Sequence, residues 1–188
     1  MSESHPLRPI LCAYVTNCLQ ALQIESGQML KNSAFHVEVF YDERRQEPVF
    51  CEAASRVSGC RVSDNWTRAL GLNLLDEHTV GQVQSQPPSL TQPMRPHRIV
   101  GSIYIPVRVG FIRNLPETCP IDGIVDYTSY FKAGDMVREA VDGAGFKKRL
   151  VFAFVEGPNE ESVLITLDRF RKWFYSTHVV DPLTVPHE

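Results

Sequence analysis

The sequence lacks long apolar runs, paired cysteines and an excess of basic charge, and each absence excludes a class of protein. No apolar stretch approaches the length of a bilayer span, and the opening MSESHPLRPI has neither a basic start nor an apolar segment typical of a secretory signal. The five cysteines form no CxxC pair and leave one odd, which is typical of reduced thiols. We therefore expect a cytoplasmic protein with no membrane partner.

Charge gives little support for a nucleic-acid partner. The chain has 19 Lys and Arg against 22 Asp and Glu, so its formal net charge is −3, whereas binding to phosphate backbones depends on basic side chains. A local patch is still conceivable on the expected last helix, where Arg169 and Lys172 stand beside Trp173 and could contact single-stranded phosphates and bases. Single-stranded nucleic-acid binding is therefore a third hypothesis, considered but not favoured.

Motifs that hold phosphates or metals are also missing. The sequence contains neither GxGxxG nor GxxxxGK[ST], and the spacing of its cysteines matches no zinc motif. Asp135, Glu139 and Asp142 would share a helix face, but an acidic stripe of this kind is usually a solvated surface. From these patterns we predict no metal site and no cofactor.

Hydrophobic periodicity predicts an alternating series of helices and strands. Helices are expected over 9–23, over 64–75 with Asp64 as its N-cap, over 129–142, and from Asn159 to about Thr177, and strands over 35–43, 49–57, 98–113 and 146–155. The fold class that follows is α+β, with a small mixed sheet of about four strands, three to four helices packed on it and a C-terminal β-α unit. Residues 1–188 are expected to form one domain.

Two segments are unusual within that scheme. Residues 78–97 are rich in Pro and Gln, and we interpret them as a loop or linker within the domain. The expected strand at 98–113 would extend about 50 Å at roughly 3.3 Å per residue, too long for a compact domain of this size. It should therefore bend at Gly101, Pro106 or Gly110. Its inward face is expected to comprise Ile99, Ile103, Ile105, Val107, Val109 and Phe111.

The favoured function is that of a non-enzymatic protein-binding or assembly subunit, an accessory component that binds a protein partner or forms a homo-oligomer. The absence of a catalytic motif weakly favours binding, and an aromatic side chain off the helix stripe, Trp173, is a residue type common at interaction hot spots. The candidate binding residues are Tyr104, Arg108, Arg169, Lys172 and Trp173.

The alternative is a small enzyme with a pocket beneath the Pro-rich loop. Its candidate nucleophile is Cys119, between two prolines, with His97 or His178 as the base. Histidine suits that role because its ordinary pKa lies near working pH. Nothing next to Cys119 in the sequence supports the pairing, so Cys119 and His97 are weak catalytic candidates.

Overall fold

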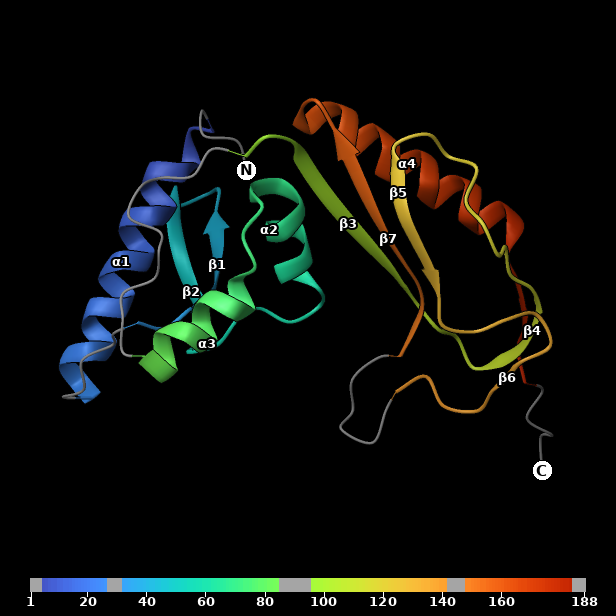
Figure 1. The fold of residues 1–188 in the computed structure, drawn as a ribbon, viewed down its shortest axis with the longest axis horizontal. Coiled ribbons are helices and arrows are strands. Elements are labelled where there is room, and N and C mark those ends of the chain that lie inside the picture. Colours follow the sequence, from blue (N-terminus) through green and yellow to red (C-terminus); the bar gives the residue numbers. More distant parts are fainter. Residues whose placement is uncertain (1–4, 27–31, 85–95, 142–147, 184–188) are drawn as a thin grey trace. The chain divides into compact units, whose positions relative to one another are not determined.

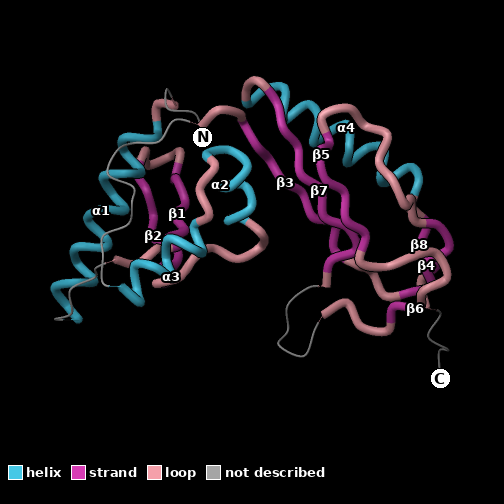
Figure 2. The backbone as a smooth tube through the Cα atoms, in the orientation of Figure 1, coloured by secondary structure: helices cyan, strands magenta, loops and turns pink. Residues whose placement is uncertain are grey.

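The computed structural model describes residues 5–26, 32–84, 96–141 and 148–183, and the chain divides into two compact units, Met1–His97 and Arg98–Glu188. Helices and antiparallel strands occur in both (Figures 1 and 2), which confirms the α+β class. About four strands were expected in one sheet, and the described residues contain eight in three sheets. A single domain over the whole chain stays a prediction.

The N-terminal unit is a β-hairpin accompanied by helices (Figure 1). Its elements are α1 Leu7–Ser26, β1 His36–Asp42, β2 Glu47–Ala54, α2 Val62–Leu70 and α3 Leu74–Gln84. The expected helix at 9–23 and the two expected strands are thus confirmed. Burial alternates along β1 as the sequence pattern predicts: Val37, Val39 and Tyr41 are half-buried, whereas Glu38 and Phe40 are exposed.

The segment after the hairpin differs from the expectation in two respects. Helix α2 begins at Val62 with Arg61 as its N-cap, and Asp64 lies in its first turn instead of capping it. Gly71, at φ 71°, ends α2 in the left-handed region that glycine adopts without strain. The next helix, α3, continues to Gln84, so residues 78–84 are helical, and residues 85–95 of the expected Pro-rich loop lie outside the described residues.

The C-terminal unit contains two antiparallel three-stranded sheets and one long helix (Figure 2). The first sheet has the order β3 (Ile99–Pro106), β7 (Arg149–Gly157), β5 (Ile124–Ser129), and the second has the order β6 (Met136–Val137), β4 (Gly110–Asn114), β8 (Val179–Asp181). Helix α4, Glu160–Thr177, contacts β3 and β7. Its expected cap is confirmed, because the Asn159 side chain accepts the backbone N–H of Ser162.

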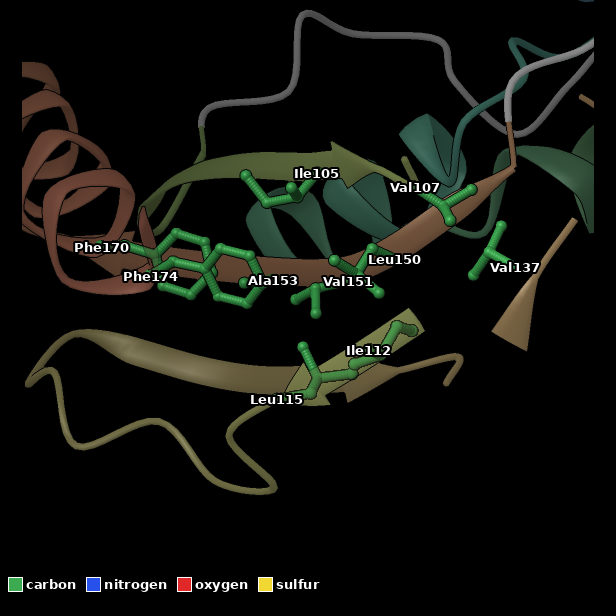
Figure 3. Close-up of a cluster of buried hydrophobic side chains, with 10 residues drawn as sticks. All are labelled: Ile105, Val107, Ile112, Leu115, Val137, Leu150, Val151, Ala153, Phe170 and Phe174. Atoms are coloured by element: carbon green, nitrogen blue, oxygen red, sulfur yellow. The ribbon is translucent and has the colours of Figure 1, made fainter. Parts of the chain in front are cut away.

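The core of this unit is formed by the central strand β7 and the inner face of α4 (Figure 3). Leu150 to Val155 are all buried, and Phe170 and Phe174 of α4 are completely buried beside Val151 and Ala153. The expected central strand is therefore confirmed. Gly101 of β3 permits the close approach of α4, since a Cβ there would lie 2.7 Å from Val163 Cγ1.

The long strand expected at 98–113 does bend, and it bends so strongly that it becomes two strands in different sheets. The break runs from Pro106 to Gly110, two of the three expected positions, whereas Gly101 lies within β3. The inward assignment of Val109 and Phe111 is wrong: both are 38% exposed, and Ile112 is buried in their place. The bend restarts the two-residue alternation, so positions on either side of it no longer share a face.

The expected helix at 129–142 is wrong. This segment continues from β5 through a loop to β6, and its backbone pairs with β4: the N–H of Gly134 donates to Ile112 O at 2.8 Å, and the N–H of Ile112 donates to Asp135 O at 2.9 Å. Long-range pairing therefore overrides a weak helical pattern, and the acidic helix stripe does not form. The Gly143–Gly145 stop lies outside the described residues.

Within the described ranges, no helix combines the length and apolar character that crossing a membrane requires.

Candidate metal centre

Three side chains with metal-binding chemistry gather on one face of the β1–β2 hairpin. His36 and Glu38 are two residues apart on β1, so strand alternation places them on the same face, and Glu52 of β2 is the direct cross-strand partner of Glu38. One ligand atom from each residue lies within 4.8 Å of the other two. Among the residues that the structure describes, no other His, Cys, Asp or Glu group meets this condition.

A β-bulge brings Glu52 to this face. Val39 pairs with Phe50, but the preceding residue of β1, Glu38, pairs with Glu52 and leaves Cys51 without a partner. A regular ladder continued from the hairpin turn would place Cys51 opposite Glu38. Glu52 would then point to the other face, because successive side chains of a strand alternate. The extra residue is what makes the two carboxylates neighbours.

The electrostatics of this face suit a cation. Two carboxylates directly opposite each other destabilise a hairpin, and no Lys or Arg of the described residues forms an ion pair with Glu38 or Glu52. His36 Nε2 lies 3.4 Å from Glu38 Oε1, while His36 Nδ1 is buried with no hydrogen-bond partner among the described atoms. A divalent cation would offset the repulsion between the carboxylates, so the donor set fits such an ion.

The chemistry of the donors indicates which ions fit. Carboxylate oxygens are preferred ligands of Mg²⁺ and Mn²⁺, and an imidazole nitrogen adds affinity for Mn²⁺ and Zn²⁺. The Glu38 side chain is 52% exposed and Glu52 is also exposed, so the ligand face opens to solvent. An open face leaves coordination positions for water or for oxygens of a substrate. An ion held here would neutralise and orient an anionic substrate.

This candidate site was not predicted from the sequence, from which no metal site was expected. Alternation places His36 and Glu38 on one face of their strand, but the position of Glu52 depends on the register across the hairpin. The turn chemistry fixes that register only up to the bulge, and the bulge at Cys51 reverses the face of every later residue. A useful signal is the pair of glutamates on two adjacent strands, which would have justified testing both registers.

The candidate nucleophile Cys119 lies in the loop between β4 and β5 and is partly buried against the C-terminal core. Burial raises the pKa of its thiol, which reduces the thiolate fraction at neutral pH, the opposite of what activates a cysteine. Its neighbour Tyr127 has a pKa raised to about 12, first by burial and second by the charge of Cys119. The catalytic role of Cys119 stays a prediction that its surroundings do not favour.

The histidines suggested as bases have other surroundings. His97 belongs to the N-terminal unit, where it is exposed and its backbone N–H donates to Ala69 O at 3.0 Å. His178 follows α4, with its ring stacked on Phe174 at 4.5 Å between centroids and its Nδ1 2.8 Å from Phe174 O. The partners of both histidines are thus residues other than Cys119, and the pairing stays a prediction.

The expected binding residues are spread over the C-terminal unit. Tyr104 is 46% exposed on β3, and Arg108 is exposed in the connection to β4. Arg169 and Lys172 are exposed on α4, where Lys172 Nζ lies 2.6 Å from an Asp168 carboxylate oxygen. Hydrogen bonds from Lys172 and then Arg171 lower the pKa of Asp168.

Trp173 does not protrude as a hot-spot anchor would. It packs against Phe170 at 5.8 Å and Tyr127 at 6.2 Å between ring centroids. Its ring is therefore partly buried against the core of this chain. Trp173 was expected to be exposed because it lies off the apolar stripe formed by Val163, Phe170 and Phe174. Aromatic side chains are long enough to reach the core from the flank of a helix.

Comparison with known proteins places the fold. Neither a protein-family model nor a curated protein matches the sequence. Among solved structures, an L-amino acid ligase from Bacillus licheniformis matches with a TM-score of 0.69 and 17% identity over 98% of this chain and 43% of that one. A phosphoribosylglycinamide synthetase from Anaerococcus prevotii matches with a TM-score of 0.60 and 12% identity over 96% of this chain and 44% of that one. The chain thus spans less than half the length of both proteins.

The comparison corrects the functional expectation. A non-enzymatic assembly subunit was favoured, as an accessory component or oligomer, but the fold is shared with a ligase and a synthetase. The favoured hypothesis was wrong because it relied on the lack of a contiguous catalytic motif. The three candidate ligands come from two strands and depend on their register, which a search for local motifs does not detect.

Proposed function

We propose that the chain carries the divalent-cation site of an ATP-dependent ligase with an ATP-grasp-like fold. The observation that carries the proposal is the pairing of Glu38 with Glu52, two carboxylates facing each other without a Lys or Arg partner in the described residues. The similarity in fold to a ligase and a synthetase supports this reading of the pair. It replaces the expectations of no metal and no cofactor.

Each residue of the centre has a defined task in this proposal. Glu38 and Glu52 supply oxygen ligands to Mg²⁺ or Mn²⁺, and His36 supplies a nitrogen ligand or a hydrogen bond that orients Glu38. An ion held by these residues would supply positive charge against the phosphates of ATP, which is the main electrostatic task in phosphoryl transfer. The names of the two neighbours refer to an amino acid and to a glycinamide, which supports an amino-acid amide as the product class.

The cytoplasm remains the proposed location. No disulfide joins any of the five cysteines, and Cys18 and Cys119 are only partly exposed. A reducing compartment keeps thiols in this state, and it is also where ATP is abundant. Two partly buried thiols and three exposed ones would be at risk of oxidation elsewhere.

The proposal is tested by measuring MgATP binding to the full chain by isothermal titration calorimetry. Glu38→Gln and Glu52→Gln each keep the shape of the side chain but remove a charge, so each is expected to weaken MgATP binding about tenfold or more. Glu47→Gln is the matched control: it removes the same charge from the same hairpin, at a glutamate that pairs with Arg45 at 3.6 Å. It should change the affinity less than twofold.

Equal effects of the three substitutions would show that ATP responds only to the net charge of the hairpin, and the proposed centre would be wrong. Binding of ATP that is unchanged when Mg²⁺ is removed with a chelator would also contradict it. The expected pattern is a loss confined to Glu38→Gln and Glu52→Gln and dependent on the metal.

A further inference from the structure

The bulge beside the metal centre is held by a side chain from outside the hairpin. The backbone N–H of Phe50 donates to the Tyr14 hydroxyl at 3.0 Å, and Phe50 is the residue immediately before the unpaired Cys51. Tyr14 is half-buried on α1, a helix that contacts both strands of the hairpin. A helix side chain therefore binds the backbone at the point where the register changes.

This contact bears on the placement of Glu52, because a regular ladder is the alternative to the observed bulge. A bulge interrupts the ladder, and an isolated two-stranded sheet is only marginally stable. Regular pairing would place Cys51 opposite Glu38 and would also relieve the repulsion between the glutamates. Any interaction that favours the bulged register therefore keeps Glu52 on the ligand face.

We propose that Tyr14 is a positioning residue for the metal centre: its hydroxyl fixes Phe50 next to the bulge and so keeps Glu52 opposite Glu38. The inference rests on the proposed function, since it concerns the same cation site. The hydrogen bond of Tyr14 is to the backbone of β2 and not to a ligand side chain. Tyr14 acts through the backbone of β2.

The test uses Mn²⁺ alone, bound to the full chain and followed by the electron paramagnetic resonance signal of the free ion. Tyr14→Phe removes one hydroxyl and is expected to weaken Mn²⁺ binding about three- to tenfold, the effect of one hydrogen bond. Tyr41→Phe is the matched control on the same hairpin, since its hydroxyl donates to Gln46 Oε1 at 3.3 Å, away from the bulge. It should change the affinity less than twofold.

A deletion of Cys51 separates positioning from general stabilisation. Without that residue, regular pairing itself places Glu52 opposite Glu38, so Mn²⁺ binding should persist. Tyr14→Phe should then weaken it less than twofold. A loss of the same size in both backgrounds would show that Tyr14 merely stabilises the unit. Failure of the deleted chain to bind Mn²⁺ would contradict the register argument.

The outcomes also separate this inference from the proposed function. If Glu52→Gln abolishes Mn²⁺ binding while Tyr14→Phe behaves like Tyr41→Phe, the metal centre stands and the role of Tyr14 is wrong. If Glu52→Gln leaves Mn²⁺ binding unchanged, the proposed centre itself is wrong. Far-ultraviolet circular dichroism of each variant shows that the helices, including α1, remain folded.

Discussion

The two units of this chain differ in how they bury apolar side chains. Of the fifteen buried hydrophobic residues in the described ranges, Leu72 is in the N-terminal unit and the other fourteen are in the C-terminal unit. Both units expose large apolar side chains, with Phe40 at 66% and Val83 at 78% in the N-terminal unit and Leu164 at 59% in the C-terminal unit. The C-terminal unit thus contains the main hydrophobic core, and the candidate metal centre lies on the unit with little core.

This difference is physically reasonable for a binding site. Segments that bind ligands are commonly the less stable parts of a protein, because they must rearrange as a ligand binds. In the N-terminal unit, order at the site comes from directed hydrogen bonds as well as burial: Tyr14 accepts from Phe50, and the His78 ring accepts from the backbone N–H of Ala34 at 3.1 Å. We expect the two units to respond differently to mutation.

The largest effect is expected from a cavity in the C-terminal core. Phe170→Ala removes a completely buried ring and should lower the free energy of unfolding by about 3–5 kcal/mol. Each unit contains one tryptophan, Trp66 or Trp173, so single-tryptophan chains followed by fluorescence in urea report on each unit. The transition seen by Trp173 should shift more than the one seen by Trp66. Equal shifts would show that both units unfold together. They would contradict the expectation that the two units respond differently to mutation.

A smaller effect is expected from adding one methyl group. Gly101→Ala places a Cβ 2.7 Å from Val163 Cγ1 and 3.2 Å from Leu167 Cδ1, so overpacking should destabilise the C-terminal unit by about 1–3 kcal/mol. Gly59→Ala in the N-terminal unit is the control, since nothing lies within 4 Å of its added Cβ. Thermal unfolding should show a lower midpoint for the first variant and little change for the second, and the reverse order would refute the packing described for α4.

The smallest effect concerns pH and the C-terminal unit. Burial raises the pKa of Tyr127 from 10.0 to about 12, so the folded state holds this proton more tightly than the unfolded state. The associated stability is complete below pH 10 and is lost as the pH rises toward about 12. Urea unfolding between these values should show stability falling with pH, and Tyr127→Phe should flatten the slope. If the fall in stability with pH is unchanged in Tyr127→Phe, another titrating group is responsible for it.

Local patterns were sufficient to predict elements whose burial follows a single period. Strand β1 and helix α4 follow this rule, β7 could be predicted from its continuous apolar run, and the Asn159 cap could be read from adjacent residues. The prediction was wrong where partners distant in the sequence determine the structure. Residues 130–141 form a loop and strand because Gly134 and Asp135 pair with Ile112, and no local pattern carries that information.

The candidate site illustrates the same limit more sharply. His36 and Glu38 could be placed on one strand face from alternation, but Glu52 joins them only through the unpaired Cys51. A one-residue change of register reverses a whole face. The sequence therefore contains all three ligands while the site depends on a bulge, which in turn contacts Tyr14 of a preceding helix.

The most direct test of the central claim is an anomalous difference map from crystals of the full chain grown with Mn²⁺. The account predicts a peak between the carboxylates of Glu38 and Glu52, at bonding distance from an oxygen of each, with His36 beside it. A map with no peak there, and with Glu52 turned to the opposite face of the hairpin from Glu38, would contradict it.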